Sequence, residues 1–161
     1  MLRDDVQWGY KAICDLDLTF DALGFPRHLA NFLTLLQRYP TMRVVIDHCM
    51  KPQIRDHSPA NFRFWADGIS RLADSGAHCK FSALITEAAP DWTVADLKPY
   101  IDHVLSAFGP EKVMWGSDWP VCRLRAEYEV WLAAARRLTD HLPPAAKARI
   151  YGDTAAEFYR L

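Results

Sequence analysis

Two side chains that can do chemistry, His48 and Asp118, each follow a short apolar run of the sequence. His48 follows Val44–Asp47, and Asp118 follows Val113–Trp115 after a glycine and a serine. Short apolar runs cut off by glycine or proline are typical of buried strands. A neutral imidazole and a carboxylate that face one cavity can hold a borderline cation such as Zn²⁺, or can activate a water without metal. Taken singly, each residue fits a structural role equally well: a core histidine, or a capping aspartate.

Four further side chains follow predicted strands and are candidates for contacts with a substrate. Lys51 is either a solvated lysine or a clamp for an anionic or hydroxylated group. Glu87 is either a solvated loop carboxylate or a pocket residue, and Trp119 is either a lid over the pocket or a plug in the rim. Arg27 lies past the end of the first predicted strand. Asp47 precedes the candidate histidine, so we expect it to point to the opposite side of its strand and to bind a helix or loop.

The remaining histidines and the cysteines show no spacing typical of metal ligands. We expect the other five histidines to lie at the surface: His28, His57, His78, His103 and His141. No two cysteines form a CxxC pair, so we expect them to be reduced and buried, as in a cytoplasmic protein. These four are Cys14, Cys49, Cys79 and Cys122.

The elements that must position these groups alternate between strand-like and helix-like patterns. Strands are predicted over residues 18–23, 42–46, 79–85 and 112–115. Helices are predicted over 3–13, 27–38, 59–76, 93–108, 125–138, 143–150 and 153–159, with Ser58 and Asp153 as N-caps. Short apolar strands between helices predict an α/β fold of parallel βα units with both sheet faces covered. In that architecture the loops 49–57, 86–92 and 116–120 lie at one end of the sheet.

Composition limits the class of protein further. The chain has 161 residues, of which 50% are hydrophobic and 12% aromatic, so we expect one domain with a substantial core. Its formal net charge of -1 does not indicate binding to nucleic acid or to an anionic membrane. No apolar run approaches the roughly 18 residues that a membrane span needs, and the charged start does not resemble a signal peptide.

Four segments together resemble the amidohydrolase-related family of TIM-barrel, metal-dependent hydrolases, which includes sugar lactonases and 2-pyrone-4,6-dicarboxylate lactonase. These segments are Phe20–Leu23 (FDAL), Val44–Pro52 (VVIDHCMKP), Cys79–Ala88 (CKFSALITEA) and Met114–Cys122 (MWGSDWPVC). The order and spacing match from about Ala12 to the end of the chain. The resemblance implies a (β/α)₈ barrel, of which this chain holds the C-terminal half, strands five to eight, with the site at the C-terminal ends of the strands.

The resemblance also implies a reaction, in which water attacks the carbonyl of a small-molecule lactone. In such relatives the residue matching Asp118 is the general base. The residue matching His48 binds a divalent metal, Zn²⁺ before others, or polarises the carbonyl where there is no metal. A basic residue matching Lys51 contacts the substrate, and the usual glycine before it is Met50 here.

The chain departs from the family in lacking the first four strands and their HxH histidine pair. A complete barrel takes about 250 residues, and the six histidines include no pair spaced i, i+2. We therefore expect residues 1–161 to be a single, incomplete amidohydrolase-type domain, which associates with a missing N-terminal half or with a second copy. The alternative is an inactive half-barrel that acts only as a structural or association module. A small doubly wound binding domain is disfavoured because no Gly-rich loop follows the first strand.

Overall fold

The computed structural model describes residues 1–56 and 58–161, and its centre is one parallel sheet. The strands are β1 (Thr19–Ala22), β2 (Arg43–Ile46), β3 (His78–Phe81) and β4 (Val113–Trp115). They pair in the order β1-β2-β3-β4, and every neighbouring pair is parallel. A doubly wound sheet reverses its strand order at a switch point, whereas successive barrel strands do not. The fold is thus the α/β half-barrel that the sequence predicts.

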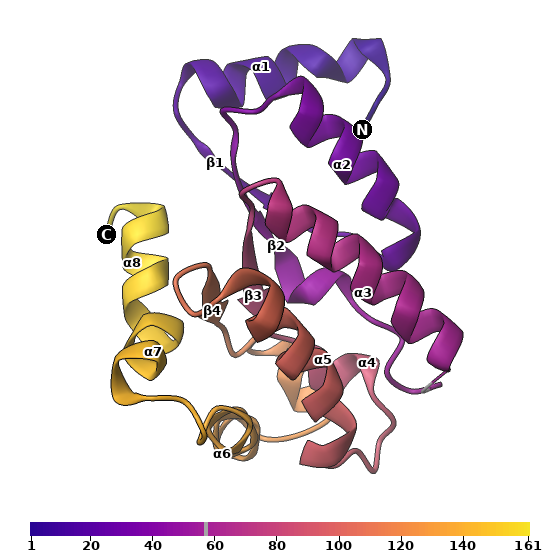
Figure 1. Cartoon of the computed structure of the whole chain (residues 1–161), viewed down its shortest axis with the longest axis vertical. Helices are drawn as coiled ribbons and strands as arrows, with labels where there is room; N and C mark the ends of the chain where they lie inside the picture. The colour runs from indigo at the N-terminus through magenta and orange to yellow at the C-terminus, as the bar shows by residue number, and fades with distance from the viewer. Residues whose placement is uncertain (57) are drawn as a thin grey trace.

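Helices and short turns connect the strands (Figure 1). Before β4 they are α1 (Gln7–Asp15), α2 (Leu29–Arg38), α3 (Pro59–Asp74), α4 (Leu84–Glu87) and α5 (Val94–Phe108). After β4 they are α6 (Tyr128–Leu138), α7 (Pro144–Ala148) and α8 (Thr154–Tyr159). Short 3-10 turns cover Asp4–Val6, Pro26–His28, Asp47–Met50 and Val121–Leu124, and a π-helical turn covers Arg149–Asp153. The described residues include no helix long and apolar enough to cross a membrane.

One face of the sheet, the outer face, is apolar and packs against α2, α3 and α5. Side chains alternate along a strand, so every second residue of β2, β3 and β4 points to this face. These residues are buried in the main core cluster: Val44, Ile46, Cys79, Phe81 and Val113. Figure 1 shows α2 and α3 on this side of the strands.

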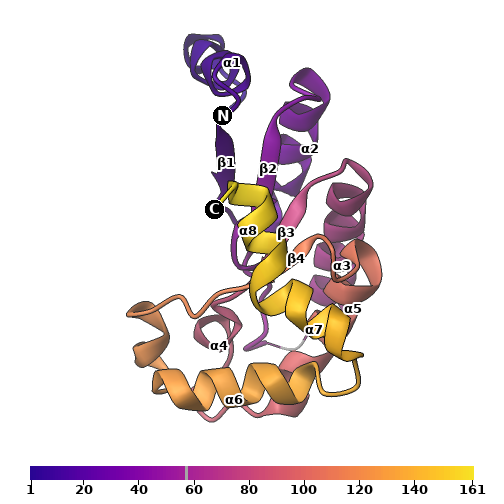
Figure 2. The same ribbon diagram turned by 90° about the vertical axis from the view of Figure 1, so that its left-hand side faces the viewer.

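The other face, the inner face, carries charged residues together with a small apolar cluster. Asp21 pairs in register with Val45, and Lys80 with Met114, so the four share this face. Val45 and Met114 are buried against Phe158 of α8. Figures 1 and 2 show α8 on the side of the sheet opposite α2 and α3. A closed barrel encloses this face, so α8 covers part of what would be the barrel interior.

Helix starts agree with the sequence where a polar cap is present. The Ser58 side chain accepts a hydrogen bond of 3.5 Å from the backbone N–H of Asn61 at the start of α3, as predicted. Asp96 closes a capping box by accepting from the backbone N–H of Thr93 at 2.7 Å. The predicted N-cap at Asp153 is wrong, because the π-helical turn joins α7 directly to α8 and Asp153 has helical dihedral angles.

The third predicted strand is too long. It ends at Phe81, and Ala83 takes a left-handed conformation (φ 56°) that starts the short helix α4. Thr86 fixes this turn by donating its hydroxyl to the Ala83 carbonyl at 2.7 Å. Leu84 is buried as expected, but in a helical turn, because a short apolar run fits a strand and a buried helix equally well. The predicted helix over 125–138 likewise begins later, at Tyr128.

Candidate active site

The turn after β2 carries the candidate histidine in an unusual backbone conformation. Residues His48, Cys49, Met50 and Lys51 all have left-handed φ angles between 50° and 60°. Non-glycine residues avoid this region because the Cβ atom approaches the backbone, so four in succession must be held by their surroundings. Cys49 and Met50 are fully buried, and Trp65 Nε1 donates to the Cys49 carbonyl at 2.7 Å. The outer layer of helices thus fixes the turn that presents His48.

Met50, which replaces the glycine typical of the resembling family, packs against another glycine. A Cβ atom built on Gly24 would lie 2.8 Å from Met50 Sδ. The thioether therefore occupies the space beside Gly24, in the loop after β1.

His48 and Asp118 meet at the carboxyl ends of β2 and β4. His48 Nε2 lies 3.7 Å from Asp118 Oδ1, and the two side chains are 17% and 19% exposed. On the other side of the ring, His48 Nδ1 lies 2.7 Å from the Ser82 hydroxyl. Burial lowers the pKa of His48, against the opposing effect of the Asp118 and Asp47 carboxylates, so the imidazole is neutral near pH 7.

This pair has a geometry suited to act on one oxygen atom. A separation of 3.7 Å is too long for a direct hydrogen bond. It is short enough that an oxygen placed beside the pair lies within hydrogen-bond distance of both the ring nitrogen and the carboxylate. A carboxylate in that position can take a proton from water, and a neutral N–H can stabilise a developing oxyanion.

Three of the predicted substrate contacts line one cavity, whose lining includes neither His48 nor Asp118. Arg27, Lys51 and Glu87 line a cavity of about 410 Å³ between the loop after β1 and the start of α3. Lys51 Nζ pairs with Glu87 Oε1 at 2.9 Å, and the two side chains are 24% and 20% exposed. The Arg27 guanidinium lies 4.6 Å from the centre of the Phe25 ring, which the sequence did not single out. The cavity offers two cations, one carboxylate and an aromatic face.

Trp119 does not lie in that cavity. Trp119 is 64% exposed, and its backbone N–H donates to the Ser117 hydroxyl at 3.1 Å. This exposure leaves the indole free to cover a ligand in this half of the barrel, and the choice between lid and plug stays a prediction.

The sequence analysis did not predict the ionic network that Lys80 forms with Asp21 and Asp47. Lys80 Nζ contacts Asp21 at 2.5 Å and Asp47 at 2.8 Å, and Tyr159 donates its hydroxyl to Asp21 at 2.9 Å. Burial alone would lower the pKa of Lys80, but hydrogen bonds to these groups outweigh it and raise the pKa. Asp47 lies in the turn Asp47–Met50 and pairs with Lys80 of β3, so the prediction that it binds a helix or loop is wrong. The sequence held one signal for this arrangement: Lys80 and Ser82 alternate along the predicted strand 79–85, so both point to the same face.

The described residues do not by themselves make a complete metal site. Residues 1–56 and 58–161 contain no group of three His, Cys, Asp or Glu side chains that could hold a metal ion. His48 and Asp118 supply two donors, whereas a catalytic zinc ion takes three protein ligands. Further ligands would have to come from outside this part of the molecule.

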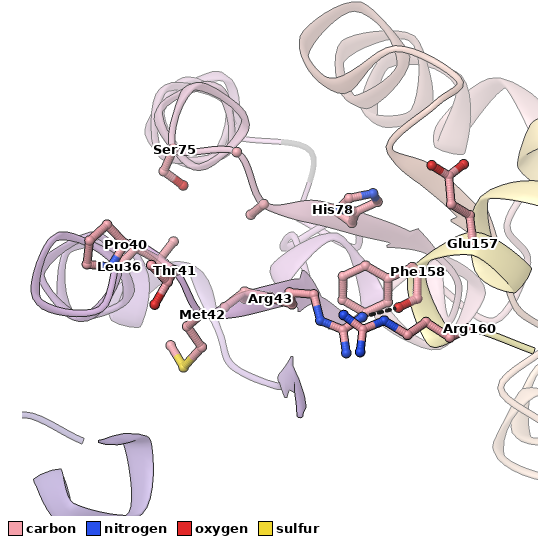
Figure 3. Close-up of a pocket in the computed structure, with 13 residues that line it drawn as sticks. Leu36, Pro40, Thr41, Met42, Arg43, Ser75, His78, Glu157, Phe158 and Arg160 are labelled. Carbon is pink, nitrogen blue, oxygen red and sulfur yellow. Dashed lines mark hydrogen bonds between the residues drawn. The ribbon is translucent and has the colours of Figure 1, made fainter. Parts of the chain in front are cut away.

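A second cavity, of 470 Å³, opens at the opposite end of the strands. Arg43, His78, Phe158 and Arg160 line it at the start of β2 and β3 and at α8 (Figure 3). Its two arginines are already paired, since Asp17 contacts Arg43 at 3.1 Å and Arg160 at 2.5 Å. In barrels this end serves stability, and catalytic groups lie at the other end.

The remaining histidines and cysteines differ in how well they match expectation. His141 is exposed as predicted, whereas His28, His78 and His103 are partly buried, and His57 lies outside the described residues. All four cysteines are free, and all but Cys14 are buried.

Comparison with known proteins places this geometry in a family. The family model described as amidohydrolase matches residues 2–161. Over 150 residues the chain is 43% identical to the L-fucono-1,5-lactonase of Burkholderia ambifaria, with 90% of this chain and 51% of the relative covered. Over 156 residues it is 35% identical to the L-fucono-1,5-lactonase of Burkholderia multivorans, with 90% and 52% covered.

Solved structures agree with these sequence comparisons. A crystal structure of an amidohydrolase from Burkholderia multivorans with bound zinc matches with a TM-score of 0.93 and 31% identity, over 99% of this chain and 58% of that one. A crystal structure from Acinetobacter baumannii, described as a probable 2-pyrone-4,6-dicarboxylic acid hydrolase, has the same fold with a TM-score of 0.80. The chain spans about half the length of the curated relatives it matches. By sequence and by fold, the chain belongs to the amidohydrolase family.

Proposed function

We propose that this chain forms one half of the active site of a lactone hydrolase. The observation that carries the proposal is the pairing of His48 and Asp118 at 3.7 Å, where two strands of a half-barrel end. The similarity to two L-fucono-1,5-lactonases supports a sugar lactone as the substrate class. In the attack of water on a carbonyl, a carboxylate can act as general base and the N–H of a neutral imidazole can stabilise the oxyanion.

In the proposed reaction Asp118 is the general base. The attacking water gives one proton to the Asp118 carboxylate, and its oxygen bonds to the lactone carbonyl carbon. Negative charge develops on the carbonyl oxygen, where the N–H of the neutral His48 ring stabilises it. When the bond between that carbon and the ring oxygen breaks, the ring oxygen takes the proton back from Asp118. The product is a hydroxy acid, and both side chains return to their starting states.

The substrate is held, in this proposal, by the cavity that Lys51 lines, three residues after His48 in the sequence. Lys51 and Arg27 donate to the hydroxyl or carboxyl oxygens of the substrate, and Glu87 accepts from its hydroxyls. The Lys51–Glu87 ion pair keeps both groups in place before binding. The exposed indole of Trp119 closes over the ligand as a lid.

We further propose that the completed site takes a divalent metal, Zn²⁺ before others. The zinc-bound amidohydrolase of Burkholderia multivorans supports this assignment. With the ion bound, His48 would be a ligand rather than an N–H donor, Asp118 would supply a second ligand, and the others would come from outside this chain. When bound, such an ion supplies a Lewis acid that polarises a carbonyl.

The proposal treats residues 1–161 as one incomplete domain. The edges of β1 and β4 pair with no further strand within the described residues. An unpaired edge is a template for association, so the partner is an N-terminal half-barrel or a second copy of this chain. The four free cysteines support a cytoplasmic location.

The test is a chimaera in which this chain replaces the matching half of the Burkholderia ambifaria lactonase. We expect the chimaera to hydrolyse L-fucono-1,5-lactone, followed as acid release at constant pH. The chain alone should be at least a hundredfold less active, because half of the barrel is missing. Light scattering on the same sample gives its mass in solution.

Two results would count against the proposal. A folded chimaera that releases no acid from sugar or aromatic lactones would favour the alternative of an inactive half-barrel that serves association. Equal activity of the chain alone and of the chimaera would show that the site is complete without the other half.

A further inference from the structure

Ser82 lies directly behind the candidate histidine and is almost fully enclosed. It follows β3, and only 2% of its surface is exposed. Gly116, the residue directly after β4, packs against it, since a Cβ atom on Gly116 would lie 3.5 Å from Ser82 Cβ. The backbone N–H of Gly116 donates to Phe81 at 3.1 Å, which holds that cover in place. Ser82 therefore has little freedom to change its partner.

The environment of the hydroxyl decides which way the hydrogen bond runs. Ser82 Oγ lies 2.7 Å from His48 Nδ1, its one side-chain partner within residues 1–56 and 58–161. If Nδ1 carried the proton, the buried Ser82 O–H would be left without an acceptor. If Ser82 donates to an unprotonated Nδ1, that donor is satisfied and only acceptor capacity is unused. An unsatisfied buried donor is the costlier defect, so Ser82 donates.

The opposite side of the ring favours the same arrangement. His48 Nε2 lies 3.7 Å from the Asp118 carboxylate. A lone pair on Nε2 would repel that negative charge, whereas an N–H attracts it. Both sides of the ring thus select the tautomer with the proton on Nε2.

We propose that Ser82 is a positioning residue that sets the tautomer of His48, so that an N–H points from Nε2 into the site. The inference deepens the proposed lactone hydrolysis, because it assigns the donor that stabilises the oxyanion. Partners of metal-bound histidines are commonly carboxylates or carbonyls, which only accept and so hold the proton on Nδ1. A hydroxyl can donate or accept, so Ser82 allows His48 to act as a donor when no cation is bound.

The test reads the tautomer directly, on the 161-residue chain labelled with ¹⁵N-histidine and kept in chelator near pH 7.5. Long-range proton–nitrogen correlation spectra separate Nδ1 from Nε2, and a His48→Asn variant identifies the His48 signals. We expect His48 to carry its proton on Nε2. Ser82→Ala should lower the ratio of the Nε2–H to the Nδ1–H tautomer by about fivefold, the effect of one hydrogen bond. Ser82→Thr, which keeps the hydroxyl, should restore the original ratio.

A second serine–histidine pair provides the matched control. Ser70 Oγ lies 3.1 Å from His103 Nε2, between α3 and α5 and outside the site. Ser70→Ala should move the His103 signals and leave those of His48 unchanged. A proton on Nδ1 of His48 in the unaltered chain would overturn the inference, as would an unchanged ratio in Ser82→Ala. Since no substrate is involved, this result is independent of whether the chimaera is active.

Discussion

The two faces of the sheet differ in what they require from the rest of the molecule. The outer face is apolar, and α2, α3 and α5 pack against it, so that most of its side chains are buried and Phe20 and Trp115 are partly buried. The inner face carries Lys80 and Asp21, meets α8 near one end, and leads to His48 and Asp118 at the other. The outer face therefore packs into a hydrophobic core within this chain, whereas the inner face is the surface that a closed barrel would enclose. Stability and chemistry are separated across a single layer of strands.

The connection between the faces is the turn after β2. Trp65, from the outer layer, bonds to the backbone of that turn and supports the left-handed conformation of His48. The packing of the outer face thus pre-organises the inner one. Away from that turn, a change on one face should leave the property of the other face intact.

Removing the carboxylate of Asp118 should have the largest effect, and on chemistry alone. Asn keeps the shape of the side chain and tolerates the left-handed conformation at this position (φ 56°). In the chimaera, Asp118→Asn should lower kcat/KM by about 10²- to 10⁴-fold, because the general base is lost. The midpoint of thermal unfolding should change little. Asp74→Asn, at an exposed position of α3, is the matched control; a loss smaller than about tenfold for Asp118→Asn would remove Asp118 from the mechanism.

Truncating Ile69 should have the converse effect. Ile69 of α3 is fully buried in the main core. Ile69→Ala should lower the free energy of unfolding by about 2–5 kcal/mol, through lost burial and a residual cavity. Urea unfolding measures the loss, and kcat/KM per folded chimaera should stay within about twofold, because Ile69 contacts neither His48 nor Asp118 and does not line the cavity of Lys51. Val130→Ala, at a position that is 54% exposed, should cost less than about 0.5 kcal/mol. A large fall in kcat/KM for folded Ile69→Ala would show that the two faces are coupled.

The sequence predicts the outer face better than the inner one, for a physical reason. Hydrophobic periodicity reports burial, and the outer face is built from burial alone. The same signal misreads residues 82–85, where the apolar run continues but the backbone turns at Ala83. No local pattern announces four left-handed residues without glycine, because the contacts that hold them come from Trp65 in a distant helix.

The site is predicted in position but not in its pairings. Knowing that parallel strands end together is enough to bring His48 and Asp118 to one edge. The partners Ser82, Lys80 and Tyr159 depend on register and on the path of α8, since Tyr159 and Asp21 are 138 residues apart in sequence. The register of the strands follows from packing across the sheet, which one amino-acid sequence does not show.

The smallest predicted effect concerns the end of the inner face that α8 covers. His78 stacks against Phe158, with ring centres 4.7 Å apart, and burial lowers its pKa. A folded-state pKa below the unfolded value of about 6.5 means that the unfolded chain binds the extra proton first. The stabilisation is thus complete above about pH 6.5 and is lost as pH falls toward the folded-state pKa. Because the ring is only half buried, we expect His78→Gln to reduce the difference in unfolding free energy between pH 7 and pH 5 by less than about 1 kcal/mol, measured by urea unfolding at both values.

His141→Gln, at an exposed position, controls for the loss of a histidine. An unchanged pH dependence in His78→Gln would mean that α8 leaves this end of the inner face open to water.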